Sequence, residues 1–366
     1  MKLDDLVNAM ESIAPTRHAE SWDNVGLLVG DPQQAISRAL LTIDYTPEVA
    51  CEAAGQQCDA IVAYHPPIFD AIKRVTATGP TAPIFDAIKR GVAIYSPHTA
   101  LDVAEGGTND VLADVLELRD RQPLKLSQPK QSQYKLVTFV PAEHVERVSQ
   151  ALFDAGAGRI GNYSSCSFQV KGAGTFFGEQ GTSPAVGSSG KLERVEEVRV
   201  ETVVPISKID AIIRALRQSH PYEEPAFDLN QLAAPPEAIG LGRVGSLPEG
   251  VTADMLVNRI KRELGIDHVL VAGDPARLVR RAAVCAGACG NLLDDAIAQK
   301  VDLYLTGEMR HHDALKAAAR GVTVVCTLHS NSERATLKRL AVKLKEKLPA
   351  LPVSISKMDR DPLAIR

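Results

Sequence analysis

Three histidines of this 366-residue chain stand directly after short apolar segments. His65 follows AIVAY, His98 follows VAIYSP and His329 follows VTVVCTL. Such runs are typical of buried strands, and α/β proteins bind their ligands at the carboxyl ends of parallel strands. A single histidine in such a place more often has a packing or capping role. Three of them indicate a polar site.

Two of these histidines have a carboxylate four residues later, since Asp102 follows His98 and Glu333 follows His329. On a helix this spacing brings two side chains to the same face. Imidazole and carboxylate together suit Zn²⁺, Mn²⁺ or Fe²⁺. A metal bound by such residues and by His65 would unite segments from opposite ends of the chain in one site.

A structural explanation stays open for each pair. The segment Ser-Asn-Ser-Glu at 330–333 fits a capping box, in which Glu333 would accept a hydrogen bond from a backbone N–H. Asp102 could belong to the turn before Gly106. The residues alone therefore allow either a metal site or local roles for both carboxylates.

Three other polar segments could supply ligands or have local roles. Glu308, His311 and His312 follow another apolar segment and could line the same pocket or form a solvated helix start. The amides of AGACG (286–290) could receive an anion at a helix N-terminus, or this segment could be a tight turn. HPYEE (220–224) could offer ligands, or it could connect a helix to a strand.

The two outer parts of the chain alternate between helical and strand patterns. In the first part we expect helices near 3–13, 47–56 and 83–90, and strands at 39–43, 60–63 and 92–95. After residue 245 we expect helices at 252–264, 291–299, 310–319 and 331–347, and strands at 268–272, 281–286, 302–306 and 322–327. Both parts therefore have α/β character.

The middle of the chain has a different order of elements, between polar, proline-bearing segments at 122–133 and 233–245. Its pattern is β-α-β-β-α-β, with strands at 134–140, 167–177, 197–206 and 226–232 and helices at 142–156 and 207–219. This is the order of a ferredoxin-like fold. Because its first and last strands pair, such a domain can be inserted in a loop of another domain.

Composition and charge exclude several classes of protein. The net charge of −4 gives no electrostatic reason to expect nucleic acid as a partner. No apolar segment approaches the ~18 residues of a membrane span, and the first ten residues lack the pattern of a signal peptide. The six cysteines are ordinary usage without zinc-ribbon spacing. We expect a cytoplasmic protein that binds neither membrane nor nucleic acid.

Five segments resemble, in order, the signature segments of the NIF-three-like family, whose members are commonly labelled GTP cyclohydrolase 1 type 2 homologs. These segments are SWDNVGLLVG (21–30), YHPPIF (64–69), IYSPHTALD (94–102), YLTGEMRHHD (304–313) and LHSNSE (328–333). The middle part, with GAGRIGNYSSCSF and HPYEE, is similar to the insert of the longer bacterial members, which resembles the PII and CutA proteins.

The resemblance implies the fold class and the assembly. Residues 1–126 and 240–366 would form the two halves of a discontinuous NIF-three-like α/β domain. This domain would carry an inserted, ferredoxin-like PII/CutA-like domain at 130–233. Family members assemble as homo-hexameric rings, in which dinuclear metal centres face an inner cavity.

The resemblance also implies roles for single residues in binding two divalent metal ions (Zn, Mn or Fe). His65 and Asp102 would hold one metal ion, His329 would hold the other, and Glu333 would bridge both. His98 would be a further ligand or a catalytic proton shuttle, and Glu333 is the second candidate for moving protons.

Tyr64 departs from the family pattern, because many members have a second histidine at this position as a ligand of the second metal. The phenol could coordinate weakly as a phenolate, or it could leave that position to water. We therefore expect the two metal ions to be held with different affinities.

Two functions follow from the resemblance. The first is a metal-dependent hydrolase similar to GTP cyclohydrolase 1 type 2, in which metal-activated water attacks a nucleotide or a related substrate. The alternative is a non-catalytic metal-binding or regulatory ring protein whose insert senses a ligand.

Overall fold

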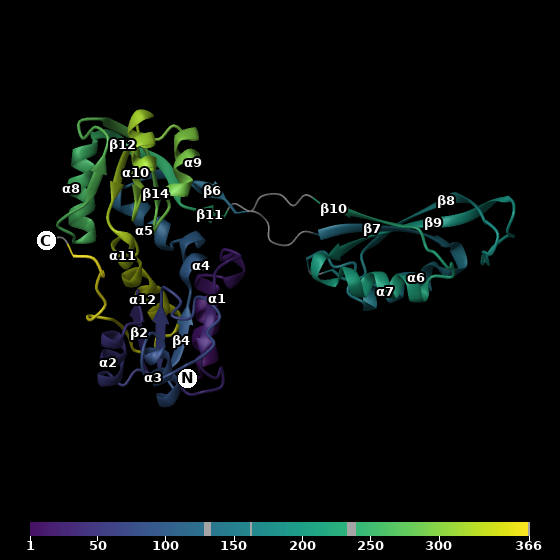
Figure 1. Ribbon diagram of the computed structural model, residues 1–366, viewed down its shortest axis with the longest axis horizontal. Coiled ribbons are helices and arrows are strands. Elements are labelled where there is room, and N and C mark those ends of the chain that lie inside the picture. Colours follow the sequence, from purple (N-terminus) through teal and green to yellow (C-terminus); the bar gives the residue numbers. More distant parts are fainter. Residues whose placement is uncertain (128–132, 162, 233–238, 365–366) are drawn as a thin grey trace. The chain divides into compact units, whose positions relative to one another are not determined.

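The computed structural model describes residues 1–127, 133–161, 163–232 and 239–364. The chain folds as two compact units, one made of Met1–Ser127 and Glu237–Arg366 and the other of Gln128–Pro236 (Figure 1). The predicted fold class, a discontinuous α/β domain with an inserted domain, is confirmed. The borders predicted for the insert, residues 130 and 233, lie outside the described residues.

The first sheet of the discontinuous unit has five strands. Their order is β1 (Gly26–Val29), β4 (Ala93–Ser96), β3 (Ala60–Ala63), β2 (Ala39–Thr42) and β17 (Val353–Ile355). β4, β3, β2 and β17 are parallel, whereas β1 is antiparallel to β4. Every residue of β2, β3 and β4 is buried, as expected for parallel strands that are covered on both faces.

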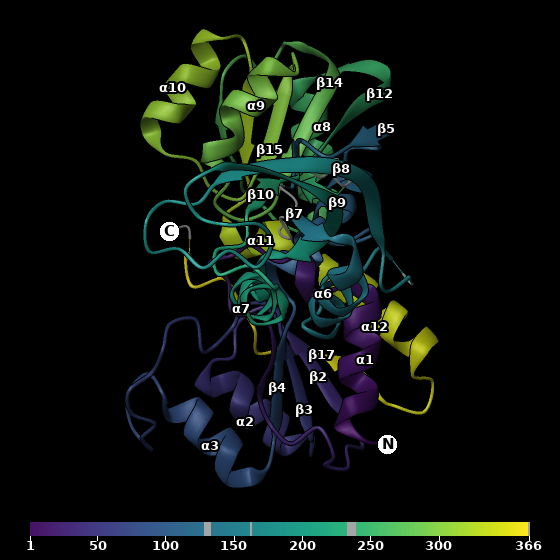
Figure 2. The ribbon, with the colours of Figure 1, turned by 90° about the vertical axis from the view of Figure 1, so that its right-hand side faces the viewer.

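Helices cover both faces of this sheet. Successive residues of a strand point to opposite faces, so each buried strand has apolar side chains on both sides that need a covering helix. Leu41, Val62 and Tyr95 share a core with α1 (Leu3–Ile13) and α12 (Thr336–Lys347). Leu40, Ile61 and Ile94 share a core with α2 (Pro47–Gly55) and α3 (Ala82–Arg90). Figure 2 shows α2 and α3 on one side of β4, β3 and β2, and α1 on the other. Since β17 and α12 come from the C-terminal part, both outer parts are needed to complete this layer.

The second sheet of the same unit has six strands. Their order is β13 (Leu270–Ala272), β16 (Thr323–Cys326), β15 (Leu303–Thr306), β14 (Leu278–Cys285), β12 (Arg243–Thr252) and β5 (Arg119–Gln122). Its faces are covered by α5 (Thr108–Val115) with α8 (Ala253–Leu264), and by α9 (Leu293–Ala298) with α10 (His311–Ala319). The edge strand β5 comes from the N-terminal part.

Two helices of six residues begin close to strand ends: α4 (His98–Val103) follows β4, and α11 (His329–Arg334) follows β16. The single helix predicted over 331–347 is wrong, because α11 starts at His329 and is separate from α12. Polar side chains tie α11 to other segments: Ser330 donates to Asp361, and Ser332 accepts a hydrogen bond from the Gly287 amide. Apolar periodicity in the sequence does not reveal such polar contacts, so it could not predict where α11 ends and α12 begins.

A two-stranded sheet marks where the chain leaves the first unit and where it returns. It consists of β6 (Lys125–Leu126) and β11 (Gly240–Leu241), which pair antiparallel with Leu126 opposite Gly240. A side chain at position 240 would meet the Lys125 carbonyl oxygen, so glycine is required there. The sequence analysis did not predict β1, β5, β6, β11, β12 or β17, which are short or interrupted by glycine, proline and charged residues.

The inserted unit is a four-stranded antiparallel sheet with two helices. Its elements are β7 (Gln133–Pro141), α6 (Val145–Asp154), β8 (Ser167–Phe177), β9 (Leu192–Pro205), α7 (Ile209–Ser219) and β10 (Phe227–Gln231). The strand order β10-β7-β9-β8 places the first and last strands side by side and confirms the ferredoxin-like prediction. Among the described helices of the chain, none is both long enough and apolar enough to span a bilayer.

Candidate metal centre

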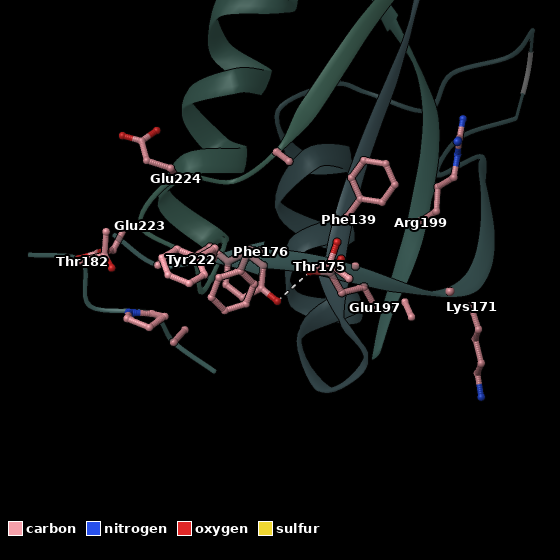
Figure 3. Close-up of a pocket in the computed structure, with 18 of the residues that line it drawn as sticks. Phe139, Lys171, Thr175, Phe176, Thr182, Glu197, Arg199, Tyr222, Glu223 and Glu224 are labelled. Carbon is pink, nitrogen blue, oxygen red and sulfur yellow. Dashed lines mark hydrogen bonds between the residues drawn. The ribbon is translucent and has the colours of Figure 1, made fainter. Parts of the chain in front are cut away.

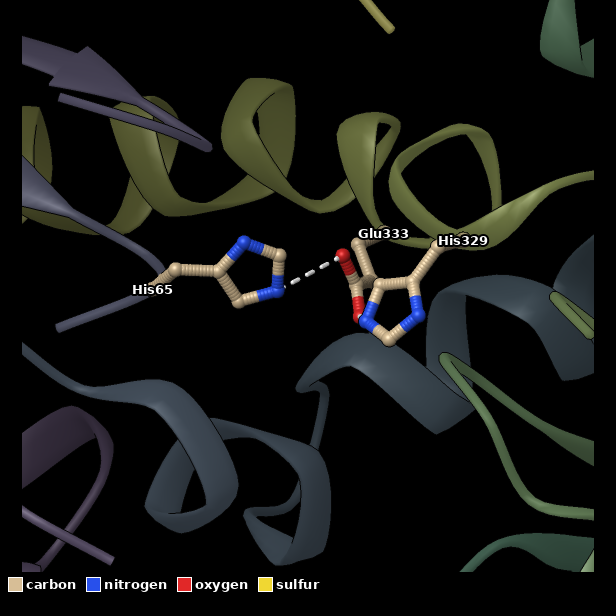
Figure 4. Close-up of side chains that lie close together, drawn as sticks. All are labelled: His65, His329 and Glu333. Atoms are coloured by element: carbon tan, nitrogen blue, oxygen red, sulfur yellow. Dashed lines mark ion pairs between the residues drawn. The ribbon is translucent and has the colours of Figure 1, made fainter. Parts of the chain in front are cut away.

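His65, His329 and Glu333 converge at one point of the discontinuous unit (Figure 4). One potential ligand atom from each residue lies within 4.8 Å of the others. His65 Nε2 is 3.2 Å from Glu333 Oε2, and His329 Nε2 is 3.3 Å from Glu333 Oε1. Each oxygen of the carboxylate therefore faces a different imidazole, so the group could bridge two metal ions.

The surroundings of Glu333 fit a metal better than a helix cap. The side chain is only 3% exposed, and it is directed toward the two histidines. Glu333 Oε2 and His65 Nε2 are both buried, and apart from their 3.2 Å contact with each other they have no hydrogen-bond partner among the described residues. Buried polar atoms in folded proteins usually have all their partners within the structure or in a bound ligand. A divalent cation could bind both atoms at once, and the imidazole–carboxylate donor set suits Zn²⁺, Mn²⁺ or Fe²⁺.

Two carboxylates orient the histidine rings. Asp44 Oδ1 lies 2.9 Å from His65 Nδ1, and Glu308 Oε1 lies 2.6 Å from His329 Nδ1. Each contact fixes one ring nitrogen and turns Nε2 toward Glu333. Metal-binding histidines commonly have such a carboxylate behind them. The sequence analysis named Glu308 only as a pocket residue and missed Asp44, although Asp44 follows β2 closely, as His65 follows β3.

The Asp44 carboxylate also affects the charge of His65. Burial alone would lower the pKa of His65, but the hydrogen bond to Asp44 and the charge of Glu333 outweigh it and raise the pKa to about 10. Without a metal, the ring is therefore protonated at neutral pH. Metal binding has to displace this proton, so it is coupled to proton release.

His98 lies beside the three converging residues. Its ring centre is 5.3 Å from that of His65, and its Nδ1 lies 2.7 Å from Asp23 Oδ1. The other Asp23 oxygen accepts hydrogen bonds from the amide and hydroxyl of Thr99. Burial would raise the pKa of Asp23, but the hydrogen bonds from His98 and Thr99 lower it. The sequence analysis missed Asp23, whose role depends on the pairing of β1 with β4.

Asp102 is occupied by a hydrogen bond from the Tyr64 hydroxyl. Burial, together with the charges of Asp102 and Glu333, raises the pKa of Tyr64 well above its ordinary value. Tyr64 is therefore a neutral hydrogen-bond donor. Burial also raises the pKa of Asp102 to about 6. Asp102 is not in the group of three that converges, and its predicted role as a ligand of the first metal stays a prediction.

The weaker candidates have local roles in the structure. Gly287, in AGACG, lies against the site, since a Cβ there would come within 3.1 Å of Glu333 Oε1. Its amide donates to Ser332, as expected for a tight turn. His311 and His312 are exposed and contact each other at the start of α10. His220 uses both ring nitrogens within the insert, toward the Phe139 carbonyl and the Tyr222 amide.

The comparison with known families decides what kind of protein carries this site. A model of the family described as Duf34/NIF3 (NGG1p interacting factor 3) matches residues 1–362. The chain belongs to the Duf34/NIF3 family. The resemblance inferred from the five sequence segments is therefore confirmed.

Relatives of this Duf34/NIF3 protein match over nearly their whole length. It is 37% identical over 366 residues to a protein of Mycobacterium leprae named "GTP cyclohydrolase 1 type 2 homolog", covering 99% of this chain and 94% of that protein. A solved structure of a Bacillus cereus protein related to NIF3 is 34% identical, with a TM-score of 0.67 over 100% of this chain and 99% of that chain. Staphylococcus aureus protein SA1388 is 28% identical with a TM-score of 0.76, again over 100% and 99%.

Proposed function

We propose that this Duf34/NIF3 protein is a dinuclear metal-dependent hydrolase that acts on a nucleotide or a related substrate. The arrangement of His65, Glu333 and His329 supports this proposal most directly. Two imidazoles from opposite ends of the chain face the two oxygens of one buried carboxylate. In the proposed centre, His65 and Asp102 would hold one ion, His329 would hold the other, and Glu333 would serve both.

When bound, two such ions would supply an activated water molecule and polarise the bond that it attacks. The protein's own groups position the reaction. Asp44 and Glu308 hold the two histidine rings, and the buried carboxylate of Glu333 is excluded from bulk water. Asp23 fixes Nδ1 of His98, so Nε2 of His98 is the atom that could accept or return a proton next to the site.

The test begins with metal analysis of protein that was purified without chelators. The protein is then reconstituted with Zn²⁺, Mn²⁺ or Fe²⁺ and assayed for steady-state turnover of a nucleotide panel that includes GTP. We expect about two ions per chain and metal-dependent hydrolysis. A His98→Gln variant should retain the metal and lose turnover. Metal binding without any turnover would contradict the hydrolase proposal.

The alternative, a non-catalytic metal-binding protein with a ligand-sensing insert, has its own supporting observation. The inserted unit contains a pocket of about 630 Å³ beside β8 and β9, with Phe139, Phe176 and Tyr222 among its lining residues (Figure 3). Tyr222 donates a 2.8 Å hydrogen bond to Glu197. Apolar walls with a fixed polar group are typical of small-molecule pockets.

One comparison separates the two functions. If the insert is a sensor, a Glu197→Gln or Phe139→Ala variant changes the response to a small ligand while metal content stays constant. If the protein is a hydrolase, turnover depends on His98 and Glu333.

We also propose a homo-hexamer as the assembly, and light scattering coupled to size-exclusion chromatography measures its mass.

A further inference from the structure

Two exposed aromatic side chains lie next to the candidate metal centre. Trp22 is 59% exposed and Phe69 is 48% exposed, and their ring centres are 6.1 Å apart. The Trp22 ring also meets His98, with ring centres 6.1 Å apart and planes at 76°. Since His98 in turn contacts His65, a continuous row of rings leads from the exposed Trp22 to the metal-binding residues.

The segments that carry these two aromatic residues are held firmly by their neighbours. Asp23, directly after Trp22, has a fully buried side chain that binds His98 and Thr99. Asn24 donates a 2.6 Å hydrogen bond to the carbonyl of Ile68, which directly precedes Phe69. The polar contacts therefore connect both aromatic segments to each other and to His98.

The polar contacts hold the residues next to both exposed aromatic rings. Exposed large apolar groups that gather at one place commonly mark a binding surface. Aromatic faces bind flat π-systems by stacking, and this leaves the edge of the bound ring free for polar contacts. A ring bound here would lie close to His98, whose ring centre is 6.1 Å from that of Trp22.

We propose that the Trp22 ring is a stacking platform for a planar nitrogen heterocycle of the substrate, such as a purine, and that the Phe69 ring, inclined by 54° to it, contacts the edge of the bound heterocycle. This inference rests on the proposed function, because it names the part of a nucleotide that the site holds. Stacking on the platform positions one edge of the heterocycle at His98. Trp22 and Phe69 are thus residues for binding and specificity, and they take no part in holding metal.

The chain contains one tryptophan, so intrinsic tryptophan fluorescence reports on position 22 alone. We would titrate the metal-reconstituted full chain with GMP and, as a control without a heterocycle, with ribose 5-phosphate, correcting for the absorbance of GMP. GMP should quench or shift the emission, and ribose 5-phosphate should not. Equal responses to the two compounds would overturn the platform.

Variants separate stacking from folding. By calorimetry, Trp22→Leu should bind GMP roughly tenfold more weakly or worse, whereas Trp22→Phe should retain most of the affinity because it keeps a ring. Phe69→Leu should also weaken binding, and Phe85→Leu, at an exposed phenylalanine on α3, is its matched control. All variants should keep the metal content of the parent protein.

The experiments distinguish a failure of the platform proposal from a failure of the hydrolase proposal. GMP binding that depends on Trp22 without any turnover supports the platform and contradicts only the hydrolase. Turnover of a nucleotide with unchanged KM in Trp22→Leu overturns the platform and leaves the hydrolase standing. If Trp22→Leu changes the oligomeric mass and leaves GMP binding unchanged, the aromatic pair is a contact between copies and the proposal is wrong.

Discussion

Glu333 is the residue on which the proposed metal centre should depend most, because its two oxygens face two different histidines. We expect Glu333→Ala to reduce the bound metal to a small fraction of the parent amount, since both ions lose a ligand at once. Elemental analysis after purification without chelators measures this loss. Glu346→Ala, at an exposed position of α12, is the control. Unchanged metal content in Glu333→Ala would favour a structural role for this carboxylate.

The residues behind the histidines should tune metal affinity without binding metal. Asp44→Asn and Glu308→Gln each remove the charge that orients one imidazole. We expect each variant to bind metal about 10–100-fold more weakly, as is typical for such supporting carboxylates. Competition with a chromogenic chelator measures the affinity. Asp86→Asn, which alters a surface pair with Arg90 on α3, should have no effect.

Tyr64 should make the two metal sites unequal. Its hydroxyl donates to Asp102, and its raised pKa opposes phenolate formation. The ion held by His65, Asp102 and Glu333 should therefore be the tighter one, and the ion at His329 should be lost first on mild chelation.

Replacing the phenol tests this inequality. Tyr64→His should raise the occupancy of the weaker site, because a neutral imidazole is a better ligand than a phenol at neutral pH. Tyr64→Phe, which removes only the hydroxyl, should not raise it. Calorimetric titration of the metal-free proteins distinguishes one class of sites from two. Equal affinities in the parent protein would contradict the argument.

At the scale of elements, the ends of strands carried most of the predictive information. Apolar runs followed by histidine correctly located β3 and β16 and drew attention to His65 and His329, which the structure brings together. Asp23 was missed because its contact with His98 needs the antiparallel pairing of β1 and β4, and a single short strand does not encode its partner. The sequence analysis predicted one helix over 331–347 and so joined most of α11 to α12. The polar contacts that hold α11 are made with other segments of the chain, and the local sequence does not show them.

The turn after α7 should make the insert sensitive to acid. His220 is neutral there, since its Nε2 faces the Phe139 carbonyl and its Nδ1 accepts the Tyr222 amide. Burial lowers its pKa below the usual 6.5. The folded state thus binds fewer protons than the unfolded state, so this contribution to stability is complete above about pH 6.5 and is lost as the pH falls through the folded-state pKa.

Hydrogen exchange can localise this effect in the full chain. After correction for the intrinsic rates, amides of β7 and β10 should open more readily at about pH 5 than at about pH 8. A His220→Gln variant, which does not titrate in this range, should show a smaller difference. An equal difference in both proteins would exclude His220 as the cause.

At the scale of the whole molecule, the insert should be removable. Leu126 and Gly240 are directly paired in β6 and β11, so the chain leaves and re-enters the first unit at adjacent points. We expect a chain in which Leu126 is joined to Gly240 by Asn-Gly to close as a type I′ hairpin. The shortened protein should remain monodisperse and keep its metal content, as measured by light scattering and elemental analysis.

The contrary result is equally clear. If the shortened chain only aggregates, and a longer Gly/Ser connection does not rescue it, the insert is integral to the core of the first unit.

The sequence predicted the order of elements in the insert because each element is local. It did not predict β6 and β11, which have two residues each and are defined only by their pairing across the insert.

The discontinuous unit also has a consequence in time, during synthesis on the ribosome. The sheet that carries His65 lacks β17 and α12 until the C-terminal part has been made, whereas the insert is contiguous and can fold as soon as it emerges. At about 5–20 residues per second, residues 127–355 take roughly 10–50 s to be translated. Throughout this interval the apolar surface of β2, β3 and α1 that packs against α12 stays uncovered, so the nascent chain is a candidate for chaperone binding. Prematurely terminated chains that lack α11 also lack Glu333 and His329, and therefore they cannot assemble the proposed metal centre.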